Sequence, residues 1–200
     1  THVGRPPVSP LAGVWFDNSS PTPTSATQAQ IAAEAVAASA HFGNTTQASN
    51  VNAQYVSASP ARTHPDGFPG GSFGAWHDFT GSVNGNLAYT NLPYVAPPDV
   101  PATACTTLSS PSPLDGYFST ESHEYAETVT DAWPPAGWLD NEAMAAEIGD
   151  LCVALDARET LSTGTFDVQG LWSNFTSTCI TTADITPPTI TITSSPAAGG

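Results

Sequence analysis

Segment 122–127, which reads S-H-E-Y-A-E, restricts the fold more than any other part of the chain. Residues four apart share one face of a helix, so a helix here places His123 and Glu127 together, one turn apart. Glu124 lies about 100° around the same helix. An imidazole and a carboxylate can bind a metal ion, and the neighbouring carboxylate can take a proton from a bound water. The segment therefore predicts a helix that carries a metal site with an adjacent general base, as in a metallohydrolase.

Length and composition fit one globular domain. The chain has 200 residues, of which 40% are hydrophobic, and this is enough for a substantial core. No apolar run approaches the roughly 20 residues that a membrane-spanning helix needs. The opening residues are polar and rich in proline and do not resemble a signal peptide. We expect no membrane insertion, and a chain of the kind left after secretion and processing.

The charge balance is strongly acidic. Arg5, Arg62 and Arg158 are the only arginines and there is no lysine, so 18 Asp and Glu give a formal net charge of −15 with neutral histidines. Nucleic acids and anionic membrane surfaces are bound by clustered Lys and Arg, so neither is an expected partner. Little positive charge would remain after the carboxylates are protonated, which favours an extracellular and acidic habitat.

The chain has three cysteines: Cys105, Cys152 and Cys179. An odd number allows at most one internal disulfide and leaves one free thiol. The spacing is not the C-x-x-C of a structural zinc site. An oxidising compartment is the expected environment.

Hydrophobic periodicity and turn residues predict an α+β domain over residues 1–183. Strands are expected over 11–17, 52–59, 73–80, 87–95 and 166–172. Helices are expected over 25–41, from about 113–115 to 131, and over 141–151 with Asp140 as the N-cap. Residues 184–200 are rich in Pro, Thr and Ser, and are expected to be a linker to a further domain.

Two acidic stretches read HEYAETVTD and NEAMAAEIGD. Over about residues 122–152 they resemble the thermolysin-like gluzincin peptidases, in which one helix reads H-E-x-x-H-x-V-T-D and a second reads N-E-x-x-S-D. The resemblance implies zinc bound by His123, Glu127 and Glu147, with Glu124 as general base. It also implies a zincin-like fold, in which a small mixed sheet packs on the active-site helix and on a second helix that bears a ligand.

Two further carboxylates belong to the same resemblance. Asp150 would orient His123, and Asp131 would support the ligands from the end of the motif helix. The chain departs from the family where Glu127 replaces its second histidine, and this more negative site could prefer a harder cation than zinc. His77 is the first candidate for a further ligand, or for a group that stabilises the oxyanion. A structural calcium ion also stays open.

A second resemblance extends over about residues 11–179. It rests on GVWFDNSS, THPDGF, AWHDFTG, YTNLPYV, LDG, HEYAETVTD, GW-x-D, EIGDLC and VQGLWSN. These resemble secreted bacterial proteins similar to the plant phosphate-induced (EXORDIUM-like) family. Members often carry a cysteine just before A-W-H, where this chain has Gly74, so the resemblance implies an unpaired Cys105 and a bond between Cys152 and Cys179. Members are also longer at the N-terminus, which implies a cleaved propeptide.

Together these features predict a secreted, monomeric endopeptidase that hydrolyses a protein or peptide substrate with a metal-activated water. The first alternative is a non-catalytic extracellular or wall-associated module, in which the acidic cluster is structural. The second is an acid-acting glycosidase, because carboxylate pairs are abundant.

Overall fold

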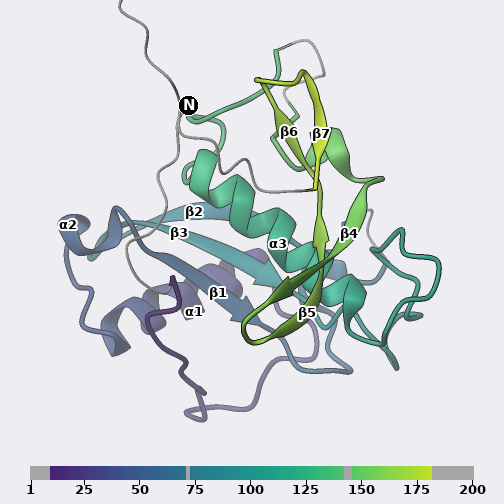
Figure 1. Ribbon diagram of the computed structural model, residues 1–200. Coiled ribbons are helices and arrows are strands. Elements are labelled where there is room, and N and C mark those ends of the chain that lie inside the picture. Colours follow the sequence, from purple (N-terminus) through teal and green to yellow (C-terminus); the bar gives the residue numbers. More distant parts are fainter. Residues whose placement is uncertain (1–9, 71–72, 142–145, 182–200) are drawn as a thin grey trace, which may run out of the picture.

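The computed structural model describes residues 10–70, 73–141 and 146–181. The expected linker over 184–200 lies outside these ranges. Figure 1 shows a mixed α+β architecture, and its elements follow in chain order. They are α1 (Gln28–His41), α2 (Gln47–Asn50), β1 (Gln54–Ala58), η1 (Pro65–Gly67), β2 (Trp76–Ser82), β3 (Gly85–Leu92), α3 (Asp115–Thr130), η2 (Asp150–Cys152), β4 (Asp156–Leu161), β5 (Gly164–Gln169), β6 (Leu171–Ser173) and β7 (Thr178–Ile180). Within the described ranges, no helix combines the length and apolar character that a membrane span requires.

A three-stranded mixed sheet forms the centre of the fold, with β3 between β1 and β2. β3 runs parallel to β1 and antiparallel to β2. Every residue of β3 from 87 to 92 is buried, as expected for a strand that is covered on both faces. The small mixed sheet expected beside the motif helix is therefore present.

Side-chain alternation along β3 assigns the two faces of the sheet to different helices. Leu87 and Tyr89 join an apolar cluster with Ile31 of α1. Thr90 points the other way and accepts a hydrogen bond from Gln54, whose amide also donates to Thr128 of α3. The sheet therefore lies between α1 and α3, with apolar packing on one face and polar contacts on the other.

Helix α1 confirms the prediction over 25–41. Its N-terminus has a capping box, in which Thr27 and Gln30 each accept from the other residue's backbone N–H. Gly43 follows the helix with a φ of +76°, a left-handed conformation that glycine adopts without strain. The buried residues of α1 include Ile31 and Ala35, which anchor the helix to the sheet.

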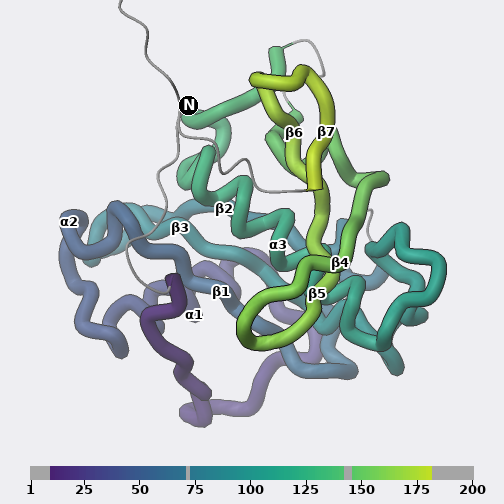
Figure 2. The backbone as a smooth tube through the Cα atoms, in the orientation of Figure 1, coloured from purple at the N-terminus to yellow at the C-terminus, as the bar shows by residue number. Residues whose placement is uncertain are grey.

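Helix α3 confirms the predicted motif helix and buries a polar surface. Apart from Gly116, every buried residue of this fully described helix has a polar side chain: Asp115, Ser119, Thr120, Glu124, Glu127 and Thr128. One stripe of α3 contacts β2 and β3, and another contacts β5 of the β4–β5 hairpin. Figure 2 traces this hairpin across the helix. Buried polar groups are stable only when they are partnered, so α3 is held by specific contacts more than by apolar packing.

The disulfide implied by the resemblance is confirmed, because Cys152 of η2 is bonded to Cys179 of β7. Cys105 has a free thiol. A Cβ built on Gly74 would lie 2.8 Å from Cys105 Sγ. Position 74, where the resembled proteins carry a cysteine, is therefore adjacent to the thiol that is left unpaired.

The predicted strand over 11–17 is wrong. These residues adopt no regular structure, and Leu11, Val14 and Phe16 are 68%, 65% and 80% exposed. Trp15 stacks on His41 at the end of α1, with 4.4 Å between the ring centroids. The apolar residues of this segment lie outside the sheet, so their periodicity does not mark a strand.

The second helix, predicted over 141–151, is also wrong in the described part of that stretch. Asp140 pairs with Ala146 in an antiparallel bridge instead of capping a helix, and residues 142–145 lie outside the described ranges. The backbone N–H groups of Gly149 and Asp150 donate to the carboxylate of Glu127. Amides used in this way cannot form the i→i−4 bonds of an α-helix, and only the short turn η2 follows.

The predicted strand over 166–172 is interrupted at Gly170 and divides between β5 and β6. β5 pairs with β4, and β6 pairs with β7. Neither β4 nor β7 was expected, since their short polar stretches lack the alternation that indicates a half-buried strand.

Candidate metal centre

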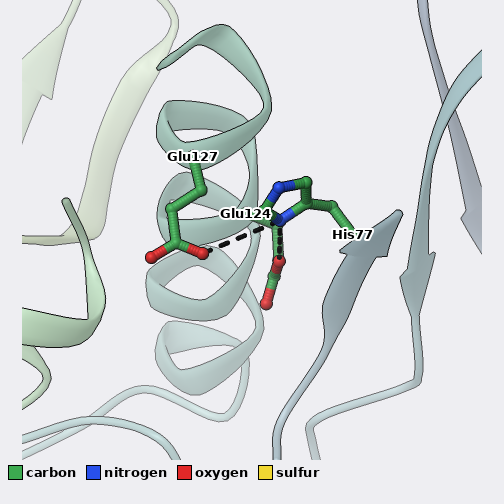
Figure 3. A group of neighbouring side chains, drawn as sticks. All are labelled: His77, Glu124 and Glu127. Carbon is green, nitrogen blue, oxygen red and sulfur yellow. Dashed lines mark hydrogen bonds and ion pairs between the residues drawn. The ribbon is translucent and has the colours of Figure 1, made fainter. Parts of the chain in front are cut away.

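His77 reaches the motif helix from strand β2. It is paired with Thr90 in the antiparallel register, so its side chain projects from the α3 face of the sheet. Figure 3 shows the imidazole pointing at α3, with its Nδ1 atom facing Glu124 and Glu127. The distances from Nδ1 are 3.3 Å to Glu124 Oε2 and 3.7 Å to Glu127 Oε2. His77, the first candidate for a further ligand, therefore lies against the motif helix and beside two of its carboxylates.

Glu127 lies between the two histidines. Its Oε2 atom is 3.1 Å from His123 Nε2 and 3.7 Å from His77 Nδ1. Its Oε1 atom accepts hydrogen bonds from the backbone N–H groups of Gly149 and Asp150, at 3.1 and 3.0 Å. These two bonds fix the carboxylate, so that Oε2 is the oxygen presented to both imidazoles.

The far nitrogen of His123 is held by a residue that was not predicted. His123 Nδ1 lies 3.0 Å from Gln169 Oε1, and the same amide donates to the carbonyl of Gly149 at 2.8 Å. An acceptor at Nδ1 places the proton there and leaves Nε2 free to ligate when the ring is neutral. Asp150, which was expected to orient His123, approaches Nε2 instead, with Oδ1 at 3.7 Å.

The second ring nitrogen of His77, Nε2, also faces hydrogen-bond acceptors. It lies 3.1 Å from the backbone carbonyl of Asp131 and 3.4 Å from Glu147 Oε1. Glu147, the expected third ligand beside His123, is thus placed beside His77. Both imidazoles have an acceptor on one nitrogen and turn the other toward Glu127, an arrangement that is usual for metal-ligating histidines.

Two groups of three side chains bring ligand atoms within 4.8 Å of one another in the described part of the chain. We name them the His77 triad (His77, Glu124 and Glu127) and the His123 triad (His123, Glu127 and Asp150). Two ligands of one tetrahedral ion with bonds of 2.0–2.1 Å lie about 3.3 Å apart. The contacts of 3.1–3.7 Å within the triads are close to this separation.

The buried carboxylates beside the two triads also favour a bound cation. Asp131 is 1% exposed, and neither of its carboxylate oxygens has a hydrogen-bond partner among the described residues. Glu147 Oε1, in contrast, is paired with His77 Nε2 at 3.4 Å. Buried carboxylates are normally hydrogen-bonded, paired or metal-bound. Imidazole and carboxylate donors suit zinc, and a carboxylate-rich set also suits harder divalent cations.

Without an ion, the histidines act as the counter-charges. Burial lowers the pKa of His77, but its contacts with Glu124 and Glu147 outweigh this and raise the pKa to about 10. Burial opposes protonation of His123 too, and Glu127 overcomes it and raises the pKa to about 9. Burial also raises the pKa of the Glu124 and Glu147 carboxyls. A metal ion that binds either imidazole must therefore displace a proton from it.

The two triads differ in access to solvent. In the His77 triad, the side chains of His77, Glu124 and Glu127 are 2%, 5% and 3% exposed. In the His123 triad, His123 and Asp150 are 13% and 47% exposed. Structural metal sites are usually closed, whereas catalytic sites keep an open position. The His123 triad is the one that a substrate could reach.

A cavity of about 210 Å³ lies at the C-terminal end of α3. It is lined by Thr130, Trp138, Ile148, Trp172, Asn174 and Phe175. Two lining residues are chain neighbours of carboxylates near the triads: Thr130 precedes Asp131, and Ile148 follows Glu147. The cavity therefore lies beside the two triads. Sequence periodicity assigned no role to Trp138 and Trp172 beyond packing.

The likenesses to gluzincin peptidases and to EXORDIUM-like proteins stay predictions from sequence motifs. No protein-family model, curated protein or solved structure matches this sequence.

Proposed function

We propose that the chain is a metal-dependent hydrolase that cleaves peptide bonds. The observation that carries the proposal is the meeting of His123 Nε2 and Glu127 Oε2 at 3.1 Å, with Asp150 beside them and Glu124 on the same helix. His123, Glu127 and Asp150 would hold the cation. Asp150 takes the place that was predicted for Glu147.

A divalent cation in this triad would polarise a water molecule and the scissile carbonyl. The protein must supply a base for the proton that the water loses. Glu124 is buried, and burial raises the pKa of its carboxyl, which makes it a stronger base than an exposed glutamate. It would take the proton from water and pass it to the leaving amine.

His77 would act beside Glu124 as a positioning residue. Its Nδ1 atom lies 3.3 Å from Glu124 Oε2, and the Asp131 carbonyl holds its other nitrogen. A protonated His77 stabilises the ionised form of Glu124 and orients the carboxylate. Its positive charge would also reduce the cost of negative charge developing on the substrate oxygen.

The cavity beside the centre is consistent with a peptide substrate. Trp138 and Trp172 line it with Asn174, which accepts a hydrogen bond from Trp172 Nε1 at 2.9 Å. Aromatic rings bind apolar side chains, while amide groups pair with a peptide backbone. A segment of substrate seated there would lead toward Glu147 and the His123 triad.

The test is hydrolysis of a quenched-fluorescence peptide library and of casein. Activity should disappear on treatment with a chelator and return with Zn²⁺ or another divalent cation. Glu124→Gln should eliminate turnover while an ion stays bound at the His123 triad. Glu159→Gln, on strand β4, removes one half-buried carboxylate outside the two triads and should behave as wild type. Full activity in Glu124→Gln would contradict the mechanism.

The second candidate is a non-catalytic extracellular module with a structural metal. The closed His77 triad favours it, since buried ligand sets are typical of structural ions. The same assay separates the two functions. Metal binding without hydrolysis of any peptide would support the module, and activity that survives chelation would point to carboxylate chemistry such as that of a glycosidase.

A further inference from the structure

We infer that the His77 triad is a second site for a divalent cation, and that an ion there blocks the general base of the proposed hydrolase. The first part rests on the geometry of His77, Glu124 and Glu127 alone. The second part rests on the proposed function, which assigns the base to Glu124.

The triad has the shape of a binding site before any ion enters. His77 Nδ1 lies 3.3 Å from Glu124 Oε2 and 3.7 Å from Glu127 Oε2, and Figure 3 shows these atoms converging between β2 and α3. The ring is held in this orientation by the acceptors at Nε2, and Glu127 is held by two backbone N–H groups. The ligands would need little rearrangement to bind.

A second observation points to a cation on this side of the centre. The Asp131 carboxylate is almost completely buried, and both its oxygens lack a hydrogen-bond partner within the described ranges. It follows α3 directly, its backbone carbonyl contacts His77, and its charge acts on Glu147, which also faces His77. The Asp131 carboxylate, which has no such partner, would stabilise positive charge beside the triad.

The two triads share one carboxylate, which links the ions. Glu127 Oε1 is occupied by backbone donors, so Oε2 is the atom that both triads use. Ions bridged by one group lie about 3.5–4 Å apart. The ion in the His77 triad would be buried, and the ion in the His123 triad would remain accessible.

Occupation of the His77 triad has a chemical consequence. An ion on Glu124 Oε2 would stabilise the ionised carboxylate, so Glu124 would become a much weaker base toward a water molecule. The same ion would occupy His77 Nδ1 and break its contact with Glu124. The singly loaded protein would therefore be active, and the doubly loaded protein would have a much weaker base.

The test of the site is a Co²⁺ titration of the chelator-treated chain, followed by calorimetry and by visible absorption. Wild type should bind two ions, and His77→Gln should bind one. Glu124→Gln is a second variant that removes a different ligand of the same triad, and it should also bind one. Loss of affinity at the second site should be on the order of 100-fold or more.

Glu159→Gln serves as the control and should bind two ions. One ion in wild type would overturn the second site. So would two ions in both His77→Gln and Glu124→Gln, if both variants keep native near-UV circular dichroism.

The weakening of the general base is tested separately, by peptide hydrolysis during the titration. The wild-type rate should fall at least about tenfold between one and two equivalents, and a rate that stays level would overturn the block.

These readouts keep the two proposals distinguishable. A stoichiometry of two ions without hydrolysis at any Co²⁺ level would support the second site and contradict the proposed function. A stoichiometry of one with chelator-sensitive hydrolysis would do the reverse.

Discussion

The two faces of the central sheet are built on opposite principles. The α1 face buries Ile31, Ala35, Leu87 and Tyr89 against one another, without a titrating carboxylate or imidazole in the cluster. The α3 face instead buries His77 with the polar stripe of α3. Strand β3 contributes to both, because its side chains alternate.

The α1 face contributes mainly to the stability of the fold, whereas the α3 face carries the groups that could bind a metal ion. Each fully buried large apolar side chain on the α1 face contributes roughly 1.5–3 kcal/mol to folding. Buried charges on the α3 face are costly to desolvate and are retained only with partners. The apolar face therefore supplies free energy that offsets the cost of burying charged groups on the polar face.

The largest expected effect is on activity, and it concerns the polar face. Replacing Glu124 with Gln should lower kcat/KM by about 10²–10⁴, because the base is lost while the shape of the side chain is kept. Thermal unfolding should change little by comparison. Steady-state hydrolysis of a fluorogenic peptide measures the first, and circular dichroism measures the second.

The matching change on the apolar face is Leu87→Ala. Leu87 is fully buried and points toward α1, so the cavity should cost about 2–5 kcal/mol of unfolding free energy. Metal affinity should stay within about twofold of wild type, because Leu87 points away from His77. Urea unfolding and calorimetry give the two values. A parallel loss of metal affinity would mean that the two faces are not independent.

A covalent link should stabilise the polar side of the sheet. The Cβ position of Gly74 lies 2.8 Å from Cys105 Sγ, so Gly74→Cys should form a disulfide with Cys105 under oxidising conditions. Closing a loop of about 30 residues should add roughly 3–4 kcal/mol. The shift in Tm should vanish on reduction. Gly74→Ser, which cannot cross-link, controls for crowding against Thr120.

The smallest expected effect concerns Asp167, which is buried where α3 meets the β4–β5 hairpin. Burial raises the pKa of its carboxyl to about 6, against a hydrogen bond from Thr106 that lowers it. A raised carboxyl pKa gives stability that is present below about pH 4 and lost as the pH rises through about 6.

Asp167→Asn should therefore raise stability above pH 6, by at most about 2–3 kcal/mol, and leave it unchanged near pH 4. Thermal unfolding across this range gives the result. An equal shift at both pH values would show that ionisation of Asp167 is not the cause.

Much of the scaffold could be predicted because its signals are local. Helix α3 and the H-E-x-x-E motif follow from spacing, and α1 follows from its alanine-rich run and capping residues. The strands of the central sheet follow from alternation, with a turn at Asn84–Gly85. The pairing of Cys152 with Cys179 required the family resemblance, since three cysteines alone leave the choice open.

The predictions that were wrong concern segments whose structure depends on contacts with distant parts of the chain. The stretch 141–151 was expected to be a helix, but the Glu127 carboxylate takes the amides of Gly149 and Asp150. Gln169 could not be identified as the partner of His123, because β5 reaches α3 only through the pairing of an unpredicted hairpin. Segment 11–17 has the composition of a strand without a partner strand beside it.

The most direct measurement is an anomalous difference map from crystals grown with Zn²⁺ and recorded at the zinc edge. If the His123 triad holds a metal ion, we expect a peak about 2.0–2.2 Å from both His123 Nε2 and Glu127 Oε2. Crystals without such a peak, in which those two atoms still contact each other directly, would contradict a metal site in the His123 triad.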